Sequence, residues 1–308
     1  MFTDSMLPQA LSAAIFRMQI RFTQPASLPR FLGATLRGGS GYAFKYNSCL
    51  QPDRKRCQGC ALESNCVYAQ MFESSPPDSS EVLSNLESIP RPFVIRPPLS
   101  EQREYKAGEQ MTFELVLMGK AIPYLTHFLI AFRNLGEFGL GYNHAQFTLE
   151  KVTAHDPYQQ KETVLYHHNH LVGSSQTLTD YVITPEKMAR ESEKHPADCL
   201  EIKFLSPTCI IHQQKTIEKP EFHHLIRAAL RRLSSISYFY CGERWEIDYS
   251  GMIEQAQSVE TIEHQIDWCE NSRWSSRQSQ RIASMGFVGI SRYHGEIRPF
   301  IPLLLAGE

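Results

Sequence analysis

The sequence predicts an α+β protein made of two copies of one strand–helix–strand–strand–helix–strand unit. Two strands, at residues 16–22 and 200–204, alternate apolar and polar side chains as expected when one face of a strand is buried, and a helical stretch follows each. Two later strands are each followed by a glycine, by a proline four residues after it, and by an apolar helix. Written twice, this order of elements is a tandem ferredoxin-like (RRM-like) fold, in which each antiparallel sheet carries its helices on one face.

The first copy begins with the strand at residues 16–22 and a helix at residues 29–46. A proline at the entry suits the first helical turn, whereas three glycines should weaken or break the C-terminal end of this helix. Strands follow at residues 93–95 and 111–118. The second helix starts after Pro123 and stops at Gly136, since glycine is favoured just past a helix end, and a glycine-rich turn and a last strand complete the copy.

The second copy repeats this plan from residue 200 onward. Its long helix, residues 221–240, carries an apolar stripe, and we expect the adjacent His223 and His224 to be exposed on it. After the strand at residues 287–293 the chain reaches an apolar helix and Glu308, without a counterpart of the first copy's glycine-rich turn and last strand. The second domain is therefore expected to lack its last strand and to leave an open sheet edge.

These patterns predict three regions. Residues 10–155 form an N-terminal ferredoxin-like domain with an insertion at about 47–68 that holds four cysteines. Residues 156–197 form a hairpin and a linker, and residues 198–308 form the incomplete C-terminal ferredoxin-like domain.

The 308-residue chain has a formal net charge of −2, which by itself argues against nucleic-acid binding. Basic side chains are nevertheless concentrated in two stretches. Residues 30–56 hold six basic residues and one acidic residue, and residues 271–298 hold five arginines and one glutamate. Phosphate binding needs a local basic surface rather than a basic total, so both stretches are candidate nucleic-acid contacts, with ordinary solvated faces as the alternative.

The sequence gives no sign of membrane insertion or export. It has no run of about 20 apolar residues, and its first nine residues lack the basic cluster and apolar core of a signal peptide. We therefore expect a cytoplasmic protein with no membrane partner, whose eight cysteines are free thiols or metal ligands rather than disulfides.

Four cysteines close together form the sharpest local pattern, Cys49-x7-Cys57-x2-Cys60-x5-Cys66. A Cys-x-x-Cys turn presents two sulfurs to one ion and the flanking cysteines can close a tetrahedral shell, so the pattern favours a structural zinc site. Because the segment is polar and basic, a metal could supply the ordering free energy that no apolar core provides. An iron–sulfur cluster, a disulfide or free thiols are the alternatives. The other four cysteines are expected to be buried small apolar residues.

Several segments together resemble a known family. They are residues 28–38 (LPRFLGATLRG), the cysteine cluster, 90–98 (PRPFVIRPP), 117–124 (LMGKAIPY), 135–141 (LGEFGLG), 268–278 (WCENSRWSSRQ) and 286–290 (GFVGI). In this order they resemble the CRISPR-associated RAMP endoribonucleases that process precursor crRNA, and the resemblance covers nearly the whole chain.

The resemblance implies a tandem ferredoxin-like protein that binds CRISPR repeat RNA and cuts it without a metal ion. In this family the 2′-hydroxyl attacks the adjacent phosphate and leaves a 2′,3′-cyclic phosphate, with a general acid and a general base near the first helix and the glycine-rich loop. This first helix has no histidine, so the available groups are Tyr42, Lys45 and Tyr46, with His144 past the internal glycine-rich turn as an alternative. Family members usually continue into a basic glycine-rich loop, often with a histidine, that these 308 residues do not contain. If that loop supplies the catalytic histidine, this form is expected to bind RNA and to cut it weakly or not at all.

Proteins that bind RNA use arginine guanidinium groups to contact phosphates and base edges, and aromatic rings to stack on bases. The candidate RNA contacts are Arg30, Arg37, Arg273, Trp274, Arg277, Gln278 and Arg281. The partners implied are crRNA and CRISPR effector or adaptation proteins. A non-cleaving RAMP-type RNA-binding subunit, or a domain of a larger CRISPR-associated protein, is the alternative. An unrelated zinc-bearing regulatory protein is a third possibility, which a duplicated ferredoxin-like core would exclude.

Overall fold

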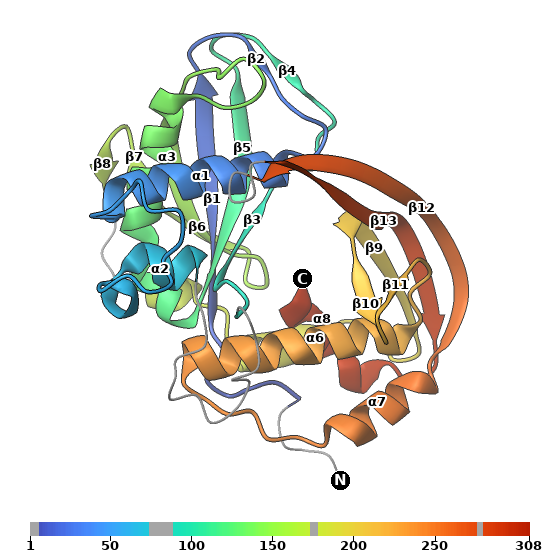
Figure 1. Ribbon diagram of the computed structural model, residues 1–308. Coiled ribbons are helices and arrows are strands. Elements are labelled where there is room, and N and C mark those ends of the chain that lie inside the picture. Colours follow the sequence, from blue (N-terminus) through green and yellow to red (C-terminus); the bar gives the residue numbers. More distant parts are fainter. Residues whose placement is uncertain (1–5, 74–88, 173–177, 276–279) are drawn as a thin grey trace. The chain divides into compact units, whose positions relative to one another are not determined.

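The computed structural model describes residues 6–73, 89–172, 178–275 and 280–308 (Figure 1). The chain divides into two compact units. The N-terminal unit comprises Ser12–Ile183 with Phe239–Cys241, and the C-terminal unit comprises Thr184–Tyr238 and Gly242–Glu308 with Met1–Leu11.

The N-terminal unit is built on a six-stranded sheet in the order β3-β5-β1-β6-β7-β8. The strands are β1 (Ala13–Phe22), β3 (Phe93–Arg96), β5 (Gln110–Met118), β6 (Phe147–Asp156), β7 (Lys161–His167) and β8 (His170–Leu171), and β2 (Ala26–Ser27) pairs separately with β4 (Glu104–Tyr105). Its helices are α1 (Leu32–Ser48), α2 (Val67–Phe72) and α3 (Leu125–Phe138), with 3₁₀ turns η1 (Glu63–Asn65), η2 (Gly119–Tyr124) and η3 (Thr179–Tyr181). The strands β6-β1-β5-β3 have the ferredoxin-like order, and β7 and β8 extend the sheet beyond it.

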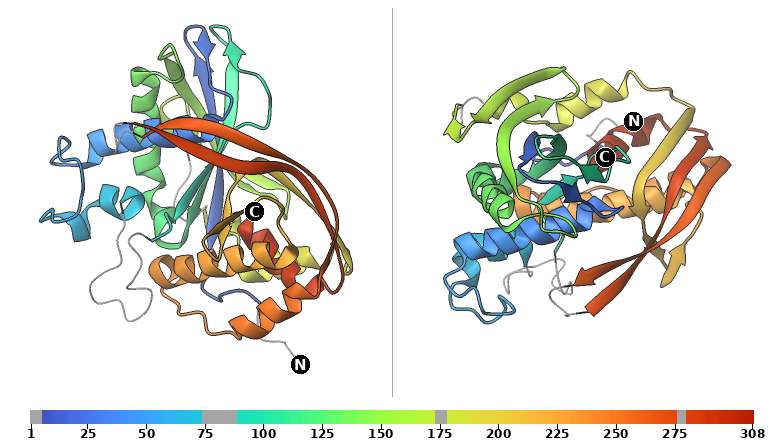
Figure 2. Two further views of the ribbon diagram at one scale, coloured as in Figure 1. Left: turned by 45° about the vertical axis from the view of Figure 1, so that its right-hand side comes forward. Right: turned by 90° about the horizontal axis from the view of Figure 1, so that it is seen from above.

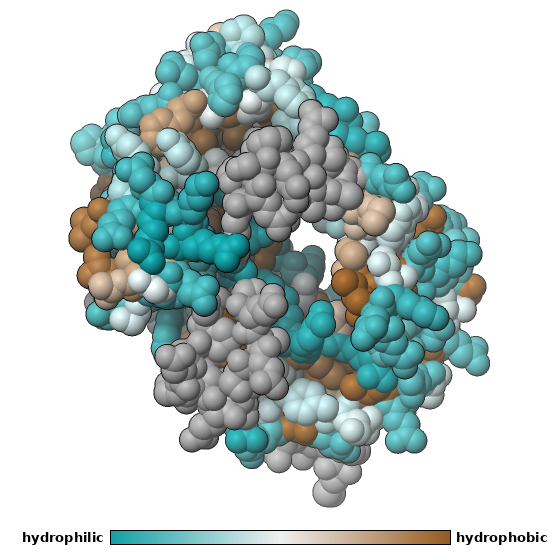
Figure 3. Space-filling model, viewed as in Figure 1, coloured by the Kyte–Doolittle hydropathy of each residue, from teal (hydrophilic) through white to brown (hydrophobic). Residues whose placement is uncertain are grey.

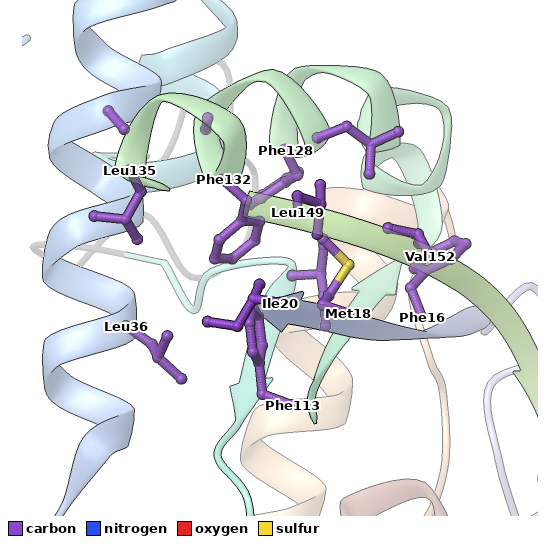
Figure 4. Packing of buried hydrophobic residues seen from close by; sticks show 14 of the residues in the cluster. Phe16, Met18, Ile20, Leu36, Phe113, Phe128, Phe132, Leu135, Leu149 and Val152 are labelled. Carbon is purple, nitrogen blue, oxygen red and sulfur yellow. The ribbon is translucent and has the colours of Figure 1, made fainter. Parts of the chain in front are cut away.

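One face of this sheet forms the core together with α1 and α3 (Figures 2 and 4). Every second residue of β1, from Phe16 to Phe22, is fully buried, as the alternating pattern predicts. Phe16, Met18 and Ile20 point toward Phe128 and Phe132 of α3 (Figure 4). The sheet and the two helices thus bury their apolar faces against each other.

Helix α1 differs from its prediction at both ends. It begins at Leu32, so Pro29 precedes the helix instead of occupying its first turn, and it continues unbroken to Ser48 through the three glycines. Tertiary contacts explain this continuity. A Cβ added to Gly39 would lie 2.7 Å from Leu135 Cδ1, and one added to Gly41 would lie 3.1 Å from Phe72 Cε1. The glycines let α3 and α2 approach α1 closely, and this packing outweighs the weak helix propensity of glycine.

The C-terminal unit contains a three-stranded antiparallel sheet in the order β12-β13-β9. Its strands are β9 (Cys199–Thr208), β12 (Glu260–Ser275) and β13 (Gln280–His294), with a separate hairpin of β10 (Ile210–His212) and β11 (Lys215–Ile217). Its helices are α5 (Pro185–Ser192), α6 (Phe222–Ile236), α7 (Tyr249–Gln257) and α8 (Ile301–Gly307). A π-helical turn η4 (Ser237–Cys241) follows α6, and a 3₁₀ turn η5 (Arg298–Phe300) precedes α8.

The second copy of the fold is visible in this order. β9, α6, β12, β13 and α8 correspond to β1, α1, β3, β5 and α3, and β9 pairs with β13 as β1 pairs with β5. Among the described residues no strand pairs with the other edge of β9, where β6 lies in the first copy. The tandem ferredoxin-like fold is confirmed.

Candidate functional site

Two exposed tyrosines lie where α1 meets the end of α3. Tyr42 and Tyr46 are 65% and 59% exposed, and both rings contact Phe138 edge-on, with centroid distances of 5.5 and 5.4 Å. Asn47 and Asn134 join the same two helices by a side-chain hydrogen bond of 2.7 Å. Each tyrosine ring thus packs against Phe138 on one side, while more than half of its surface remains exposed.

The glycine-rich turn directly after Phe138 is held from several sides. Gly139 and Gly141 have φ angles of 87° and 83°, and Leu140 and Ala145 exchange two backbone hydrogen bonds of 2.9 Å. A Cβ on Gly141 would lie 2.4 Å from Ser27 O, so only glycine fits there. His144, also at a positive φ, is exposed in this turn. In the sequence His144 follows Phe138, the residue on which both tyrosines pack, by six positions.

The other side chains predicted for this region are Lys45, Arg37 and Arg30, and each has different surroundings. Lys45 donates through Nζ to the carbonyl oxygen of Arg54 and lies 5.7 Å from the centroid of the Tyr68 ring. The ammonium group of Lys45 therefore binds the segment between α1 and α2, and its bond to the protein there sets it apart from the two exposed tyrosines. Arg37 is exposed on α1, and the exposed Arg30 covers the Phe31 ring at 5.2 Å.

The predicted RNA contacts of the C-terminal unit fall on the β12–β13 hairpin. The two strands pair from Glu260↔His294 to Ser275↔Gln280, which places Arg273 opposite Ile282 and Trp274 opposite Arg281 at the hairpin's end. Arg277 and Gln278 lie outside the described residues, and only the backbone positions of the other three are described.

The four clustered cysteines occupy the irregular segment between α1 and α2. Cys49, Cys57, Cys60 and Cys66 all line one small cavity, together with Lys45, Arg54 and Glu63 among others. The Cys-x-x-Cys turn is closed by a 2.8 Å hydrogen bond from the N–H of Cys60 to the carbonyl of Cys57, and Cys49 Sγ accepts from the N–H of Gln51 at 3.4 Å. Within the described ranges, no three His, Cys, Asp or Glu side chains are grouped tightly enough to hold a metal ion. On the surface over this segment hydrophilic residues lie beside apolar ones (Figure 3), among them the exposed Leu50 and Leu62.

The remaining cysteines correct a prediction. Cys199 and Cys209 are exposed, and Cys241 and Cys269 are partly exposed, so none of the four is a buried apolar residue. Cys199 begins β9 and Cys209 follows its last residue, and no residue of this strand is fully buried, so the strand offers neither cysteine a core to enter.

A histidine cluster in the C-terminal unit was missed at the sequence level. His223 and His224, expected to be exposed, are each only 8% exposed, because α6 turns its first residues toward the β10–β11 hairpin. The His212 ring of β10 lies 5.8 and 5.1 Å from the rings of His223 and His224. Burial lowers the pKa of both α6 histidines, Arg227 and His212 lower it further, and the Glu221 carboxylate opposes this shift. An adjacent His-His pair at a helix start, followed by Arg227 and Arg231, was the available signal.

Comparison with known proteins identifies the family. A family model of an N-terminal domain, AF_1859_N, matches residues 11–179, which is more than half of the chain. Residues 202–308 match the model of the CRISPR-associated endoribonuclease Cas6. The chain belongs to the AF_1859_N family, and its C-terminal part is a Cas6 domain.

Individual relatives of this chain are distant. An uncharacterized protein of Archaeoglobus fulgidus is 25% identical over 294 residues, which are 92% of this chain and 87% of the relative. The structure titled "Cas6 (TTHB231) product complex" has a TM-score of 0.51 at 12% identity and covers 94% of this chain and 91% of that one. The "Partial Cas6-RT-Cas1--Cas2 complex" has a TM-score of 0.51 at 13% identity, and this chain spans only 43% of that longer one. At these identities the two structures show the shared fold.

The Cas6 model that residues 202–308 match describes a CRISPR-associated endoribonuclease. No helix among the described residues is long and apolar enough to cross a lipid bilayer.

Proposed function

We propose that this protein binds CRISPR repeat RNA and cuts it by a metal-independent transesterification. A general base takes the proton of the 2′-hydroxyl, whose oxygen attacks the adjacent phosphorus. A general acid gives a proton to the departing 5′-oxygen, so the products end in a 2′,3′-cyclic phosphate and a 5′-hydroxyl. The match of residues 202–308 to the Cas6 family carries this proposal.

His144 and the tyrosines Tyr42 and Tyr46 are the proposed proton-transfer groups. All three are exposed, and they lie on the glycine-rich turn and on the α1 face that packs against Phe138. An imidazole can act as acid or base near neutral pH, and a phenol can donate to a leaving oxygen. Lys45 is the weaker candidate, because its ammonium group is already bonded to the Arg54 carbonyl. Arg30 and Arg37 are the proposed cations for the RNA backbone in this unit.

The test is cleavage of an end-labelled repeat RNA in excess EDTA. We expect one cut per repeat and a 3′ end that blocks ligation until the cyclic phosphate is removed. His144→Ala should lower the single-turnover rate by about 10²–10⁴-fold without weakening RNA binding, whereas Tyr142→Phe, in the same exposed turn, serves as the matched control. Tight repeat binding with no cleavage would instead favour the non-cleaving RNA-binding subunit.

The partners of this chain are also proposals. CRISPR repeat RNA follows from the Cas6 match of residues 202–308, and an association with Cas1 and Cas2 is supported by a structural relative whose title names such a complex. Copurification of Cas1 with the tagged protein from its host would test the second point.

We further propose a structural zinc ion bound by Cys49, Cys57, Cys60 and Cys66. Support comes from the four thiols lining one cavity and from the N–H···S bond at Cys49, a contact that stabilises a thiolate. Zinc would draw the thiolates together and order the segment between α1 and α2.

A further inference from the structure

A cavity with charged walls lies within the C-terminal unit and shares no residue with the candidate site of the N-terminal unit. It has a volume of about 320 Å³ and is formed by β10, α6 and α7. Its polar wall consists of His212, His224, Arg227 and Arg231, and its apolar wall includes Ile210, Ile211, Leu230 and Ile253. This volume is at the lower end of the range for small-molecule sites and suits a ligand of about nucleotide size.

The hydrogen bonds of the α6 histidines fix which ring nitrogens carry protons. The backbone N–H of Glu221 donates to His224 Nδ1 at 3.1 Å, and Arg227 Nε donates to His223 Nδ1 at 3.3 Å. A nitrogen that accepts a hydrogen bond has no proton, so both rings are neutral and protonated on Nε2. His223 Nε2–H is used by the Glu221 carboxylate at 3.1 Å. His224 Nε2–H is left as a donor on a side chain that is more than nine-tenths buried and lines the cavity.

Two arginines complete an anion-binding wall. Arg227 and Arg231 are four residues apart on α6 and therefore lie on the same face of the helix. Within the described part of the chain, no hydrogen bond or ion pair engages the guanidinium of Arg231, and the only carboxylate bonded to the histidine pair belongs to Glu221. Guanidinium groups combined with an imidazole N–H match phosphate oxygens in geometry and charge.

The remaining lining residues are mainly apolar, apart from the Tyr249 hydroxyl. The Tyr249 hydroxyl is bonded to Ser234 Oγ at 2.8 Å and to the Trp245 carbonyl at 2.9 Å, so it is committed to the protein. His212 is followed by a two-residue turn, Gln213 and Gln214, both with positive φ, which sets the hairpin's geometry. A nucleobase or ribose can pack against Ile211 and Ile253 while its phosphate meets the arginines.

A metal ion fits this place poorly. Three of the four ring nitrogens of His223 and His224 are already bonded to protein groups, and two arginines repel a cation. We propose that this cavity binds one nucleotide of single-stranded RNA, with its phosphate held by Arg227, Arg231 and His224 Nε2–H and its base against the isoleucine wall. The choice of RNA rests on the proposed function.

The test pairs Arg231→Gln with Arg232→Gln, which removes the same charge from the next residue, one that does not line the cavity. Binding of an unstructured oligoribonucleotide is measured at several salt concentrations. Arg231→Gln should lower the slope of log K against log salt by about 0.7, the value for one phosphate contact on a single strand. Arg232→Gln should leave the slope unchanged. Equal slopes for the wild-type protein and Arg231→Gln would overturn the inference.

A second measurement does not depend on cleavage. In protein carrying ¹³C-labelled histidine, adenosine 5′-monophosphate should shift the ring resonances of His212 and His224, and Arg231→Gln should abolish these shifts. Absence of any shift at millimolar nucleotide would overturn the inference while leaving repeat cleavage unaffected. Failure of the wild-type protein to cut repeat RNA, with the shifts intact, would contradict the proposed function alone.

Discussion

The hydroxyl of Tyr293 donates a hydrogen bond of 2.7 Å to the carbonyl oxygen of Pro220, and both residues are buried. The bond connects β13 to Pro220, two residues before the first residue of α6. Phe222, two residues further on, packs edge-on against the Tyr293 ring at 5.4 Å. The position of the histidine pair at the start of α6 therefore depends on this contact with the sheet.

Tyr293→Phe should destabilise the C-terminal unit by about 1–3 kcal/mol, because it leaves a buried carbonyl without a donor while keeping the ring. All three tryptophans belong to this unit, so urea unfolding followed by tryptophan fluorescence reports on it directly. Tyr142→Phe, at a 73% exposed position, should leave the transition unchanged. An unaltered midpoint for Tyr293→Phe would show that the bond contributes no net stability.

Adjacent glycines of α1 offer a matched pair for the contact between α1 and α3. Gly38→Ala has no heavy atom within 4 Å of the new methyl group, so it should stabilise the N-terminal unit by about 0.5–1 kcal/mol through helix propensity. Gly39→Ala gains the same propensity but places its methyl 2.7 Å from Leu135 Cδ1 in the core. It should cost about 1–3 kcal/mol by overpacking. Thermal unfolding followed by circular dichroism tests both, and equal melting temperatures would contradict the close crossing.

The zinc proposal predicts about one zinc ion per chain in protein purified without added metal, as a closed four-thiolate site requires. Cys57→Ser and Cys60→Ser should each abolish metal binding and lower the melting temperature. Cys199→Ser, an exposed cysteine outside the cluster, should change neither. Elemental analysis combined with a thiol assay makes the measurement. Metal-free protein with the wild-type melting temperature would rule the site out.

The order of strands and helices could be predicted because the apolar residues of a core strand or helix recur with the period of that element. β1 alternates and α3 carries one apolar stripe, so local periodicity predicted both. The continuity of α1 was not readable, since it depends on Leu135 and Phe72, which lie far away in sequence. Periodicity likewise suggested that His223 and His224 face solvent. Only the β10–β11 hairpin, placed against α6 by the tertiary fold, buries them.

The hairpin arginines give a separate RNA-binding prediction. The double variant Arg273→Ala, Arg277→Ala should weaken binding to repeat RNA and lower the slope of log K against log salt by about 0.7 for each phosphate that the variant no longer binds. Arg298→Ala is the control, because this exposed arginine belongs to the same basic stretch but lies outside the hairpin. Unchanged affinity and slope would mean that the two hairpin arginines do not bind RNA.

The last prediction concerns pH. Burial lowers the pKa of His223 and His224 below the ordinary histidine value of 6.5, so the unfolded chain binds more protons than the folded one once the pH falls below that value. Their contribution to stability is therefore complete above about pH 6.5 and is lost as the pH falls toward the lowered values, by up to about 1.4 kcal/mol per pH unit for each histidine. Protonating His224 on Nδ1 would also break its bond with the Glu221 N–H.

Urea unfolding of the C-terminal unit between pH 7.5 and about 5 should show this loss of stability. The double variant His223→Gln, His224→Gln should show a shallower pH dependence whatever its stability at pH 7.5, with the remaining slope due in part to His264, whose pKa burial also lowers. Parallel curves for the variant and the wild-type protein would mean that the pair titrates alike in the folded and unfolded chain.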